Sequence, residues 1–437
     1  MMLSPEQQKD LERAILEYVN GKGYQEAAAA LKKESPFLQN SGPDAASENI
    51  LERKWLTIVR LQAKIVELER RQAETEEILS RSVRNLKVPE TNGESAGDGQ
   101  QIKNPTLKLS KAYKGHKEPI NAVAIHNSEP VFCSAASDAT IRIYDYEIQS
   151  QVAMLRGHTH SVNCLVWGKE TLYSGSSDMT IKSWNSSNKT NPFDFPEFTC
   201  TRTYIGHEHL ISYLLNIKDT DFLISCSRDK TIRLWDKSSG YNKRTISGVN
   251  EDWIRAIDCN AKHLVSAGND RNIFVFDLVK FTQTPDNKEL QSLSLVINTF
   301  EAHENYIECI KVLKKHHPGD EDTVVFTASR DKTVGAWNYL KGTCIAILKG
   351  HENWVKGLTL IEDFGFLVSI GEDKTIRIWD IKKKKAVYVE KNAHDHFVSS
   401  VDYHPQFRII ATGSVDKSSK VWKLVNSNSL DLIAGVI

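Results

Sequence analysis

Aspartates, hydroxyl side chains and histidines recur together along this chain at fixed spacing. A serine or threonine stands four residues before each of seven aspartates, and an aromatic residue stands six residues after each one. A histidine stands roughly twenty to thirty residues before six of them, and Asn250 takes its place before the other. The aspartates are Asp138, Asp178, Asp229, Asp270, Asp331, Asp373 and Asp416, and the histidines are His116, His158, His207, His303, His351 and His394.

Histidine and aspartate are common metal ligands, and the run His394-Asp395-His396 has the residue types of a metal site. A period in the forties, however, is typical of a β-propeller, in which each repeat forms one blade. Successive histidines would then lie in different blades and could not converge on one ion. The chain also has no GxSxG, HExxH or GKS/T pattern. We therefore predict no metal, no cofactor and no catalytic residue, and hence a protein that is not an enzyme.

The recurring residues are instead the types needed for a buried chain of hydrogen bonds. A buried carboxylate requires donors, which an imidazole and the amides of a tight turn supply, and a hydroxyl can continue the chain to an indole N–H. In the sixth repeat the members would be Asp373, His351, Ser369 and Trp379. Tyr144 and Phe276 replace tryptophan in repeats one and four. We expect repeat four, which also lacks the histidine, to be the least regular.

The repeats predict a mainly β fold, a seven-bladed propeller that resembles the WD-repeat family. Each repeat contains short alternating strands, such as 231–236, joined by tight turns. A strand at Leu107–Tyr113 should pair with the last three strands, 398–423, and so close the ring. The longest departures from the repeat, at 191–198, 279–298 and 314–322, are expected to be surface loops.

Bulk composition argues against several classes of function. The 437 residues contain 56 Lys+Arg and 56 Asp+Glu, and a net charge of zero argues against nucleic acid as a bulk electrostatic partner. No stretch approaches the ~20 apolar residues of a membrane span. The seven cysteines include no CxxC pair, which favours a reduced intracellular compartment. We therefore expect a soluble cytoplasmic protein.

Two short helices with apolar stripes are predicted within residues 1–40. Leu11, Ile15 and Tyr18 fall on the first stripe, and Tyr24 and Leu31 on the second. Helices this short cannot bury their apolar faces alone, so a second copy of the chain is the simplest partner. The spacing of these residues resembles the LisH dimerisation motif, and the alternative is an ordinary helical hairpin.

A short coiled coil is predicted within residues 48–85. Ile58, Leu61, Ile65 and Leu68 occupy the a and d positions of two heptads. β-Branched residues at a with leucine at d favour a parallel dimer, and the alternative is a single amphipathic helix folded onto residues 1–40. A polar, glycine-containing linker follows at residues 86–106, and the propeller is assigned to residues 107–437.

The histidine loops and the aspartate turns of a propeller lie on one face, so positions counted from them can be placed together. Three residues after the histidine position, repeats four to seven carry Trp253, Tyr306, Trp354 and Phe397. Basic residues occupy three further counted positions. Arg228 and Arg330 stand one residue before the aspartate, Arg255 and Lys356 stand five residues after the histidine position, and Lys374 stands one residue after the aspartate. Aromatic residues ringed by arginine and lysine are the composition of a binding hot spot.

The order of these parts resembles the Lissencephaly-1 family of nuclear distribution proteins, and strings such as LERKWLTIVRLQAKIVELE, SRDKTIRLWD and GHENWVKG support the resemblance. The family implies a non-enzymatic dimeric regulator that binds the cytoplasmic dynein heavy chain and promotes its microtubule-based activity in nuclear migration and spindle positioning. It also implies NudE-type coiled-coil adaptors and microtubule plus-end proteins as partners. The implied location is the cytoplasm and cytoskeleton, at microtubule plus ends and spindle poles.

The resemblance also implies roles for particular residues. The dynein motor ring would meet Arg228, Arg255, Arg330, Trp354 and Lys374, and the dynein stalk would meet Asp219 and Asp221. Animal members of the family are also non-catalytic subunits of a platelet-activating-factor acetylhydrolase, which no residue here tests. The alternative function is a WD-repeat substrate adaptor of a ubiquitin ligase or a corepressor scaffold. Such chains usually carry a helical docking region before the propeller, where this chain has a coil and a polar linker.

Overall fold

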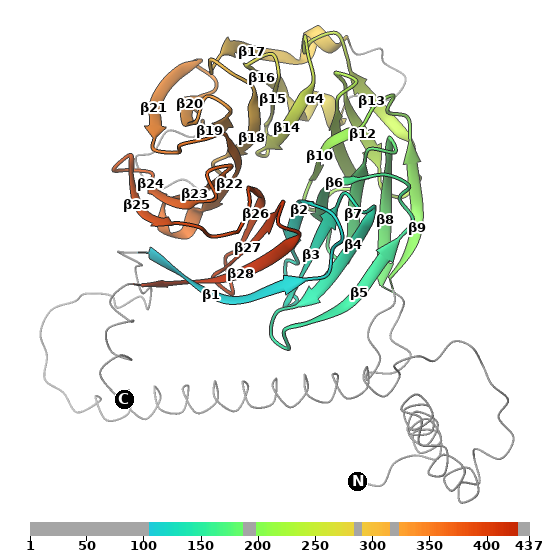
Figure 1. The fold of residues 1–437 in the computed structure, drawn as a ribbon. Helices are drawn as coiled ribbons and strands as arrows, with labels where there is room; N and C mark the ends of the chain where they lie inside the picture. The colour runs from blue at the N-terminus through green and yellow to red at the C-terminus, as the bar shows by residue number, and fades with distance from the viewer. Residues whose placement is uncertain (1–104, 187–197, 284–290, 315–322, 427–437) are drawn as a thin grey trace, which may run out of the picture. The chain divides into compact units, whose positions relative to one another are not determined.

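Seven four-stranded antiparallel sheets form the blades of a propeller in the computed structural model, which describes residues 105–186, 198–283, 291–314 and 323–426 (Figure 1). The first strand of each of the first six blades, and β26 in the seventh, lines a channel at the axis of the ring. The predicted helical motif at residues 1–40 and the predicted coil at 48–85 lie outside the described residues, as does nearly all of the predicted linker.

Strands pair in sequence order within the first four blades. Blade one contains β2 (Ile120–Ile125), β3 (Val131–Ala136), β4 (Thr140–Asp145) and β5 (Ser150–Arg156). Blade two contains β6 (Val162–Trp167), β7 (Thr171–Ser176), β8 (Thr180–Ser186) and β9 (Phe198–Ile205). Blade three contains β10 (Ile211–Asn216), β11 (Phe222–Ser227), β12 (Ile232–Asp236) and β13 (Asn242–Ile246). Blade four contains β14 (Ile254–Cys259), β15 (His263–Gly268), β16 (Asn272–Asp277) and β17 (Val296–Glu301).

The last blade differs from the others in combining both ends of the described chain. Blade five contains β18 (Ile307–Val312), β19 (Val324–Ser329), β20 (Thr333–Asn338) and β21 (Thr343–Lys349). Blade six contains β22 (Val355–Ile361), η2 (Glu362–Phe364), β23 (Phe366–Gly371), β24 (Ile376–Asp380) and β25 (Lys385–Glu390). Blade seven contains β26 (Val398–His404), β27 (Ile409–Ser414), β28 (Ser418–Asn426) and β1 (Pro105–Lys114).

The ring is closed by β1, which supplies the outer strand of blade seven. It pairs antiparallel with β28 from Pro105 opposite Asn426 to Lys114 opposite Ser418, with one irregularity between Leu109 and Lys111. The predicted closure is therefore confirmed. Because both ends of the propeller chain share one sheet, neither end leaves a long unpaired edge.

The aspartate turns have the same backbone conformation in all seven blades. The residue after each aspartate has a positive φ, for example 66° at Lys230 and 65° at Lys374. The aspartate stabilises this unusual conformation. In blade three, Asp229 Oδ1 accepts from the Thr231 amide at 2.9 Å and from its hydroxyl at 2.6 Å.

The apolar core is divided among the interfaces between neighbouring blades. One cluster, for example, joins Ile141, Ile143 and Leu155 of blade one to Val162 and Trp184 of blade two. Alternation along the strands produces this packing. In β12, Ile232 and Leu234 are fully buried while Arg233 between them is only half-buried. Each blade therefore depends on both neighbours for its burial.

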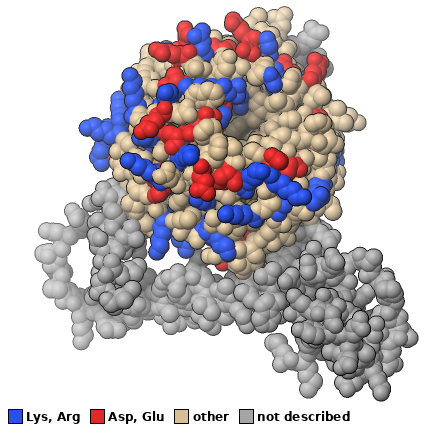
Figure 2. Space-filling model, viewed as in Figure 1, with Lys and Arg blue, Asp and Glu red and all other residues tan. Residues whose placement is uncertain are grey.

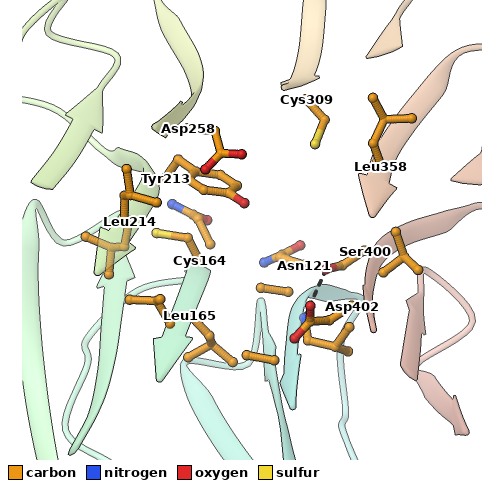
Figure 3. Close-up of a pocket in the computed structure, with 18 of the residues that line it drawn as sticks. Asn121, Cys164, Leu165, Tyr213, Leu214, Asp258, Cys309, Leu358, Ser400 and Asp402 are labelled. Carbon is orange, nitrogen blue, oxygen red and sulfur yellow. Dashed lines mark hydrogen bonds between the residues drawn. The ribbon is translucent and has the colours of Figure 1, made fainter. Parts of the chain in front are cut away.

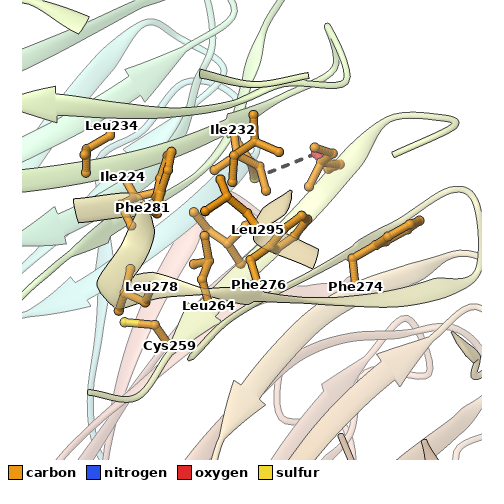
Figure 4. Packing of buried hydrophobic residues seen from close by; sticks show 14 residues of the cluster. Ile224, Ile232, Leu234, Cys259, Leu264, Phe274, Phe276, Leu278, Phe281 and Leu295 are labelled. Atoms are coloured by element: carbon orange, nitrogen blue, oxygen red, sulfur yellow. Dashed lines mark hydrogen bonds between the residues drawn. The ribbon is translucent and has the colours of Figure 1, made fainter. Parts of the chain in front are cut away.

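The blade-four insertion differs from its prediction as a surface loop. The first part of the predicted segment 279–298 lies in the short helix α4 (Leu278–Gln283), and a later part lies in the 3-10 helix η1 (Ser292–Leu295). Phe281 and Leu295 are buried in the same core cluster as Ile232 of blade three (Figure 4). The physical reason is apolar area, because both side chains lose water contact by packing between blades three and four. No helix in the described part of the chain is long and apolar enough to cross a membrane.

Candidate partner-binding face

The recurring histidine, hydroxyl, aspartate and aromatic residues meet at one end of each blade, which we call the His/Asp face. In blade six, His351 Nδ1 lies 2.8 Å from Asp373 Oδ2 and His351 Nε2 lies 2.7 Å from Ser369 Oγ. The Trp379 indole N–H donates to Ser369 Oγ at 2.8 Å. The same contacts join the equivalent residues of blades two, three, five and seven. The predicted hydrogen-bond chain is confirmed in these blades.

In the blades that have this hydrogen-bond chain, the aspartate at its end stays ionised although its side chain is largely buried. The Asp373 side chain is 4% exposed. Burial opposes ionisation, but the hydrogen bond and charge of His351, together with the Glu352 amide and Thr375, outweigh it and lower the pKa of Asp373 to about 2. The histidine loop and the aspartate turn are thus held together by a charge-assisted contact.

Blades one and four depart from this pattern, as predicted. In blade one His116 still contacts Asp138 at 3.1 Å and Ser134 at 2.8 Å, while Tyr144 stands in place of tryptophan. In blade four, Asn250 Nδ2 donates weakly to Ser266 Oγ at 3.3 Å. Two buried acceptors, Asn250 Oδ1 and Asp270 Oδ2, have no hydrogen-bond partner among the described residues. Burial raises the pKa of Asp270 to about 6.

Replacing Asp270 by asparagine should stabilise the protein at pH 7 by about 1 kcal/mol after allowance for solvent screening. A carboxyl whose pKa is raised on folding contributes stability below its unfolded pKa, and this stability is lost as the pH rises through the folded value of about 6. Asparagine removes that loss. Melting temperatures of the parent and the variant should therefore diverge as the pH rises from 4 to 7.

The matched control is Asp331→Asn in blade five, where contacts with His303 and Thr333 outweigh burial and lower the pKa of Asp331 to about 2. This variant should be less stable than the parent at pH 7. An Asp270→Asn protein that melts no higher than the parent at pH 7 would show that the buried Asp270 carboxylate, with its unpartnered Oδ2, is not a source of instability.

A backbone hydrogen bond places two of the counted positions side by side in every blade. The amide of the residue before each aspartate donates to the carbonyl of the residue three after the histidine position, as in Arg330 to Tyr306 at 3.0 Å and Glu372 to Trp354 at 2.8 Å. Residues at these two positions therefore share the His/Asp face.

Arginines and aromatic rings alternate across blades three to six of this face. The Arg228 guanidinium carbon lies 3.0 Å from the centre of the Trp253 ring, and the Arg255 guanidinium carbon lies 5.6 Å from the Tyr306 ring. The Arg330 guanidinium carbon lies 5.2 Å from the Tyr306 ring and 4.1 Å from the Trp354 ring. We call this set the cation–aromatic cluster: Arg228, Trp253, Arg255, Tyr306, Arg330 and Trp354.

The position five residues after the histidine position lines the mouth of the channel in all seven blades. The cavity has a volume of about 650 Å³, and these residues are Asn121, Asn163, Ser212, Arg255, Glu308, Lys356 and Ser399. Only blades four to six place charged residues there. Deeper in the channel, Lys311 Nζ lies 3.0 Å from Tyr213 Oη and Lys314 pairs with Asp258 at 3.2 Å. Figure 3 shows Tyr213 and Asp258 among the residues that line the channel. The described residues contain no group of three or more histidine, cysteine or acidic side chains placed to hold a metal ion.

Glu308 is a member of this site that the sequence interpretation missed. Its side chain is 7% exposed and pairs with Arg255 at 3.3 Å, with Lys356 at 2.8 Å and with the Nε of Arg330. Burial favours the neutral form, but Lys356 and then Arg255 outweigh it and lower the pKa of Glu308. The sequence signal for Glu308 is its position five residues after His303, which is equivalent to Arg255 and Lys356 in the neighbouring repeats.

Two groups of predicted site residues fall outside the cluster. Lys374 lies on the same face, in the turn after Asp373, but none of the contacts that join the cluster involves its side chain. Asp219 and Asp221 are exposed residues that precede β11, whereas Arg228 follows it. They therefore lie at the opposite end of blade three from the cluster.

On the face of the propeller seen in Figure 2, acidic and basic groups are interspersed instead of forming separate fields. In the view of Figure 2, lysine and arginine alternate with aspartate and glutamate around the hollow of the ring. A partner would therefore be recognised by local contacts more than by a long-range field.

Comparison with known proteins agrees with this architecture. The model of the WD domain, G-beta repeat, matches residues 107–145, 149–185, 198–236, 295–338, 342–380 and 385–423. The matches skip 237–294, the segment that contains Asn250 and Asp270 of the irregular blade four. The model of the PAC1 LisH domain matches residues 5–39.

Several fungal proteins are similar to this chain over almost its whole length. Nuclear distribution protein PAC1 of Yarrowia lipolytica is 32% identical and covers 97% of this chain and 99% of its own length. PAC1 of Gibberella zeae is 31% identical, with 96% and 99% coverage. Nuclear distribution protein nudF of Aspergillus niger is 32% identical, with 92% and 90% coverage.

Fold and repeats together define a seven-bladed WD-repeat propeller with an N-terminal LisH domain. Within that class, the chain belongs to the nuclear distribution protein family of PAC1 and nudF. The family resemblance and the LisH motif inferred from the sequence are thereby confirmed. The predicted coiled coil stays a prediction.

Proposed function

We propose that this protein is a non-enzymatic, dimeric regulator that binds the motor domain of cytoplasmic dynein through the cation–aromatic cluster. The observation that carries the proposal is the alternation of three arginines with three aromatic rings around one side of the channel mouth. Arginine and tryptophan dominate binding hot spots because they combine apolar area with directional hydrogen bonds. Membership in the nuclear distribution family supports the choice of partner.

The cluster suits an acidic surface of the motor ring. The Arg330 side chain is 19% exposed and the Arg255 side chain 21% exposed, so both are largely desolvated before a partner arrives. Ordering these side chains in advance reduces the entropy cost of association. Lys374 would extend the same contact. Asp219 and Asp221, at the other end of blade three, would form a separate contact with the dynein stalk.

Further partners and location belong to the same proposal. NudE-type coiled-coil adaptors and microtubule plus-end proteins would join the complex, and the protein would act in the cytoplasm on the cytoskeleton, in nuclear migration and spindle positioning. The single most informative experiment is capture of partners by the full chain from cell extract. Recovery of dynein heavy chain supports the proposal, and recovery of a ubiquitin-ligase scaffold without dynein contradicts it.

The full chain should be a dimer through residues 1–85, because the apolar stripes of Leu11 and Ile15 and the heptad residues Ile58 and Leu61 need partners. A truncated chain beginning at Pro105, where β1 starts, should be a folded monomer. Light scattering at micromolar concentration distinguishes the two states. Two propellers on one dimer would raise the effective concentration toward a two-headed motor. A monomeric full chain at that concentration would contradict the dimeric part of the proposal.

A further inference from the structure

One buried carboxylate collects three cations from three blades at the channel mouth. Glu308 lies in β18 of blade five, and its side chain is 7% exposed. Its Oε2 accepts from Lys356 Nζ of blade six at 2.8 Å, and Arg255 Nη1 of blade four lies 3.3 Å from its Oε1. The Nε of Arg330 donates to the same Oε1. Three positive groups this close would repel one another strongly without the carboxylate.

The contact with Glu308 also determines which guanidinium nitrogens of Arg255 and Arg330 remain available to a partner. Arg330 uses its Nε for Glu308, and its terminal nitrogens have no hydrogen-bond partner among the described residues. Arg255 uses Nε for Asn269 Oδ1 at 2.5 Å and Nη1 for Glu308. Arg330 therefore presents two free terminal nitrogens, the fork that can donate to both oxygens of a carboxylate, while Arg255 keeps only its second terminal nitrogen for a partner.

Arg228 provides a contrast within the same cluster. It stacks on Trp253 at 3.0 Å, but Glu308 does not contact it, and its Nε is buried with no hydrogen-bond partner among the described residues. The cluster therefore contains two arginines held by Glu308 and one held by an aromatic ring alone. This difference allows the effect of Glu308 to be separated from the effect of the cluster as a whole.

We propose that Glu308 is a positioning residue of the binding face, whose carboxylate aims Arg255 and Arg330 at carboxylate groups of the partner. The inference rests on the proposed function, because it concerns the same face and the same motor domain. Removing an acidic group from a basic face raises its positive charge, which by Coulomb attraction alone would strengthen binding to an acidic partner.

The test measures binding of the full-length dimer to purified dynein motor domain at several salt concentrations. Glu308→Gln should weaken binding about tenfold, close to the effect of Arg330→Ala, because the amide cannot hold two guanidinium groups. Glu308→Asp keeps the charge but shortens the side chain, so it should also weaken binding severalfold. The Glu308→Asp variant remains informative if Glu308→Gln proves poorly folded.

Glu372→Gln is the matched control, since it makes the same change of charge on the same face. Glu372 lies beside the cluster through its amide contact with the Trp354 carbonyl, and its carboxylate acts on Lys356 and Arg330 through charge alone, with no hydrogen bond or ion pair to them among the described residues. This variant should bind as tightly as the parent or slightly more tightly. Weakening by Glu308→Gln but not by Glu372→Gln would separate positioning from net charge.

Double variants locate the effect. Glu308→Gln combined with Arg330→Ala should cost less than the sum of the single changes, whereas Glu308→Gln combined with Arg228→Ala should cost about the sum. A Glu308→Gln or Glu308→Asp dimer that binds as tightly as the parent overturns the inference. If Arg228→Ala and Arg330→Ala also bind like the parent, the proposed function itself fails; if they bind weakly, only the role of Glu308 fails.

Discussion

Replacing Asp373 by alanine should destabilise the propeller by about 2–4 kcal/mol and impair every activity of the protein together. The side chain is 4% exposed and accepts from His351, from the Glu352 amide and from Thr375. Alanine would leave these donors without an acceptor inside the blade, and the turn that holds Lys374 at a φ of 65° would lose its stabilising contacts. Thermal unfolding followed by circular dichroism measures the loss.

Asp395→Ala is a suitable control, because Asp395 is an exposed aspartate of the same face, next to His394. Its amide, but not its side chain, contributes to the blade-seven contacts, through Asp416. That variant should melt within a degree or two of the parent. An Asp373→Ala protein with an unchanged melting curve would show that the blade-six hydrogen-bond chain does not stabilise the fold.

Residue spacing along the sequence predicted the contacts correctly wherever successive repeats have the same geometry. The spacing of His351, Ser369, Asp373 and Trp379 predicts their contacts because each blade is the same supersecondary unit. The position of Trp354 beside the aspartate turn follows from the backbone bond between Glu372 and Trp354, which recurs in every blade. Even the failure in blade four could be predicted, since Asn250 and Phe276 break the pattern in the sequence itself.

The features that were missed depend on contacts between different blades or on residues outside the repeat. Glu308, Arg255 and Lys356 occupy the same counted position, but their pairing depends on how closely the inner strands of adjacent blades approach at the channel. The burial of Phe281 and Leu295 lies in an insertion with no counterpart in other repeats, so no count applies to it. Asp219 and Asp221 precede β11 while Arg228 follows it, and only the strand between them assigns them to opposite ends of the blade.

Trp354→Ala and Arg330→Ala should each weaken binding to the dynein motor domain by about 1–3 kcal/mol. The melting temperature of each variant should stay within a degree or two of the parent's. The Arg330 guanidinium carbon lies 4.1 Å from the centre of the Trp354 ring, so either change removes one side of a stacked pair. Neither side chain belongs to the buried hydrogen-bond chains. Arg228→Ala, which removes the stack on Trp253, should have a similar effect.

Salt dependence distinguishes the two kinds of residue. Arg330→Ala and Arg228→Ala remove positive charge and should flatten the dependence of affinity on ionic strength, whereas Trp354→Ala removes apolar contact and should leave the slope unchanged. Arg156→Ala controls for net charge, because Arg156 is an exposed arginine in β5 of blade one, away from the blades that carry the cluster. It should bind like the parent. A Trp354→Ala dimer that binds the motor domain as tightly as the parent would exclude the His/Asp face as the main contact and point to the side of the propeller instead.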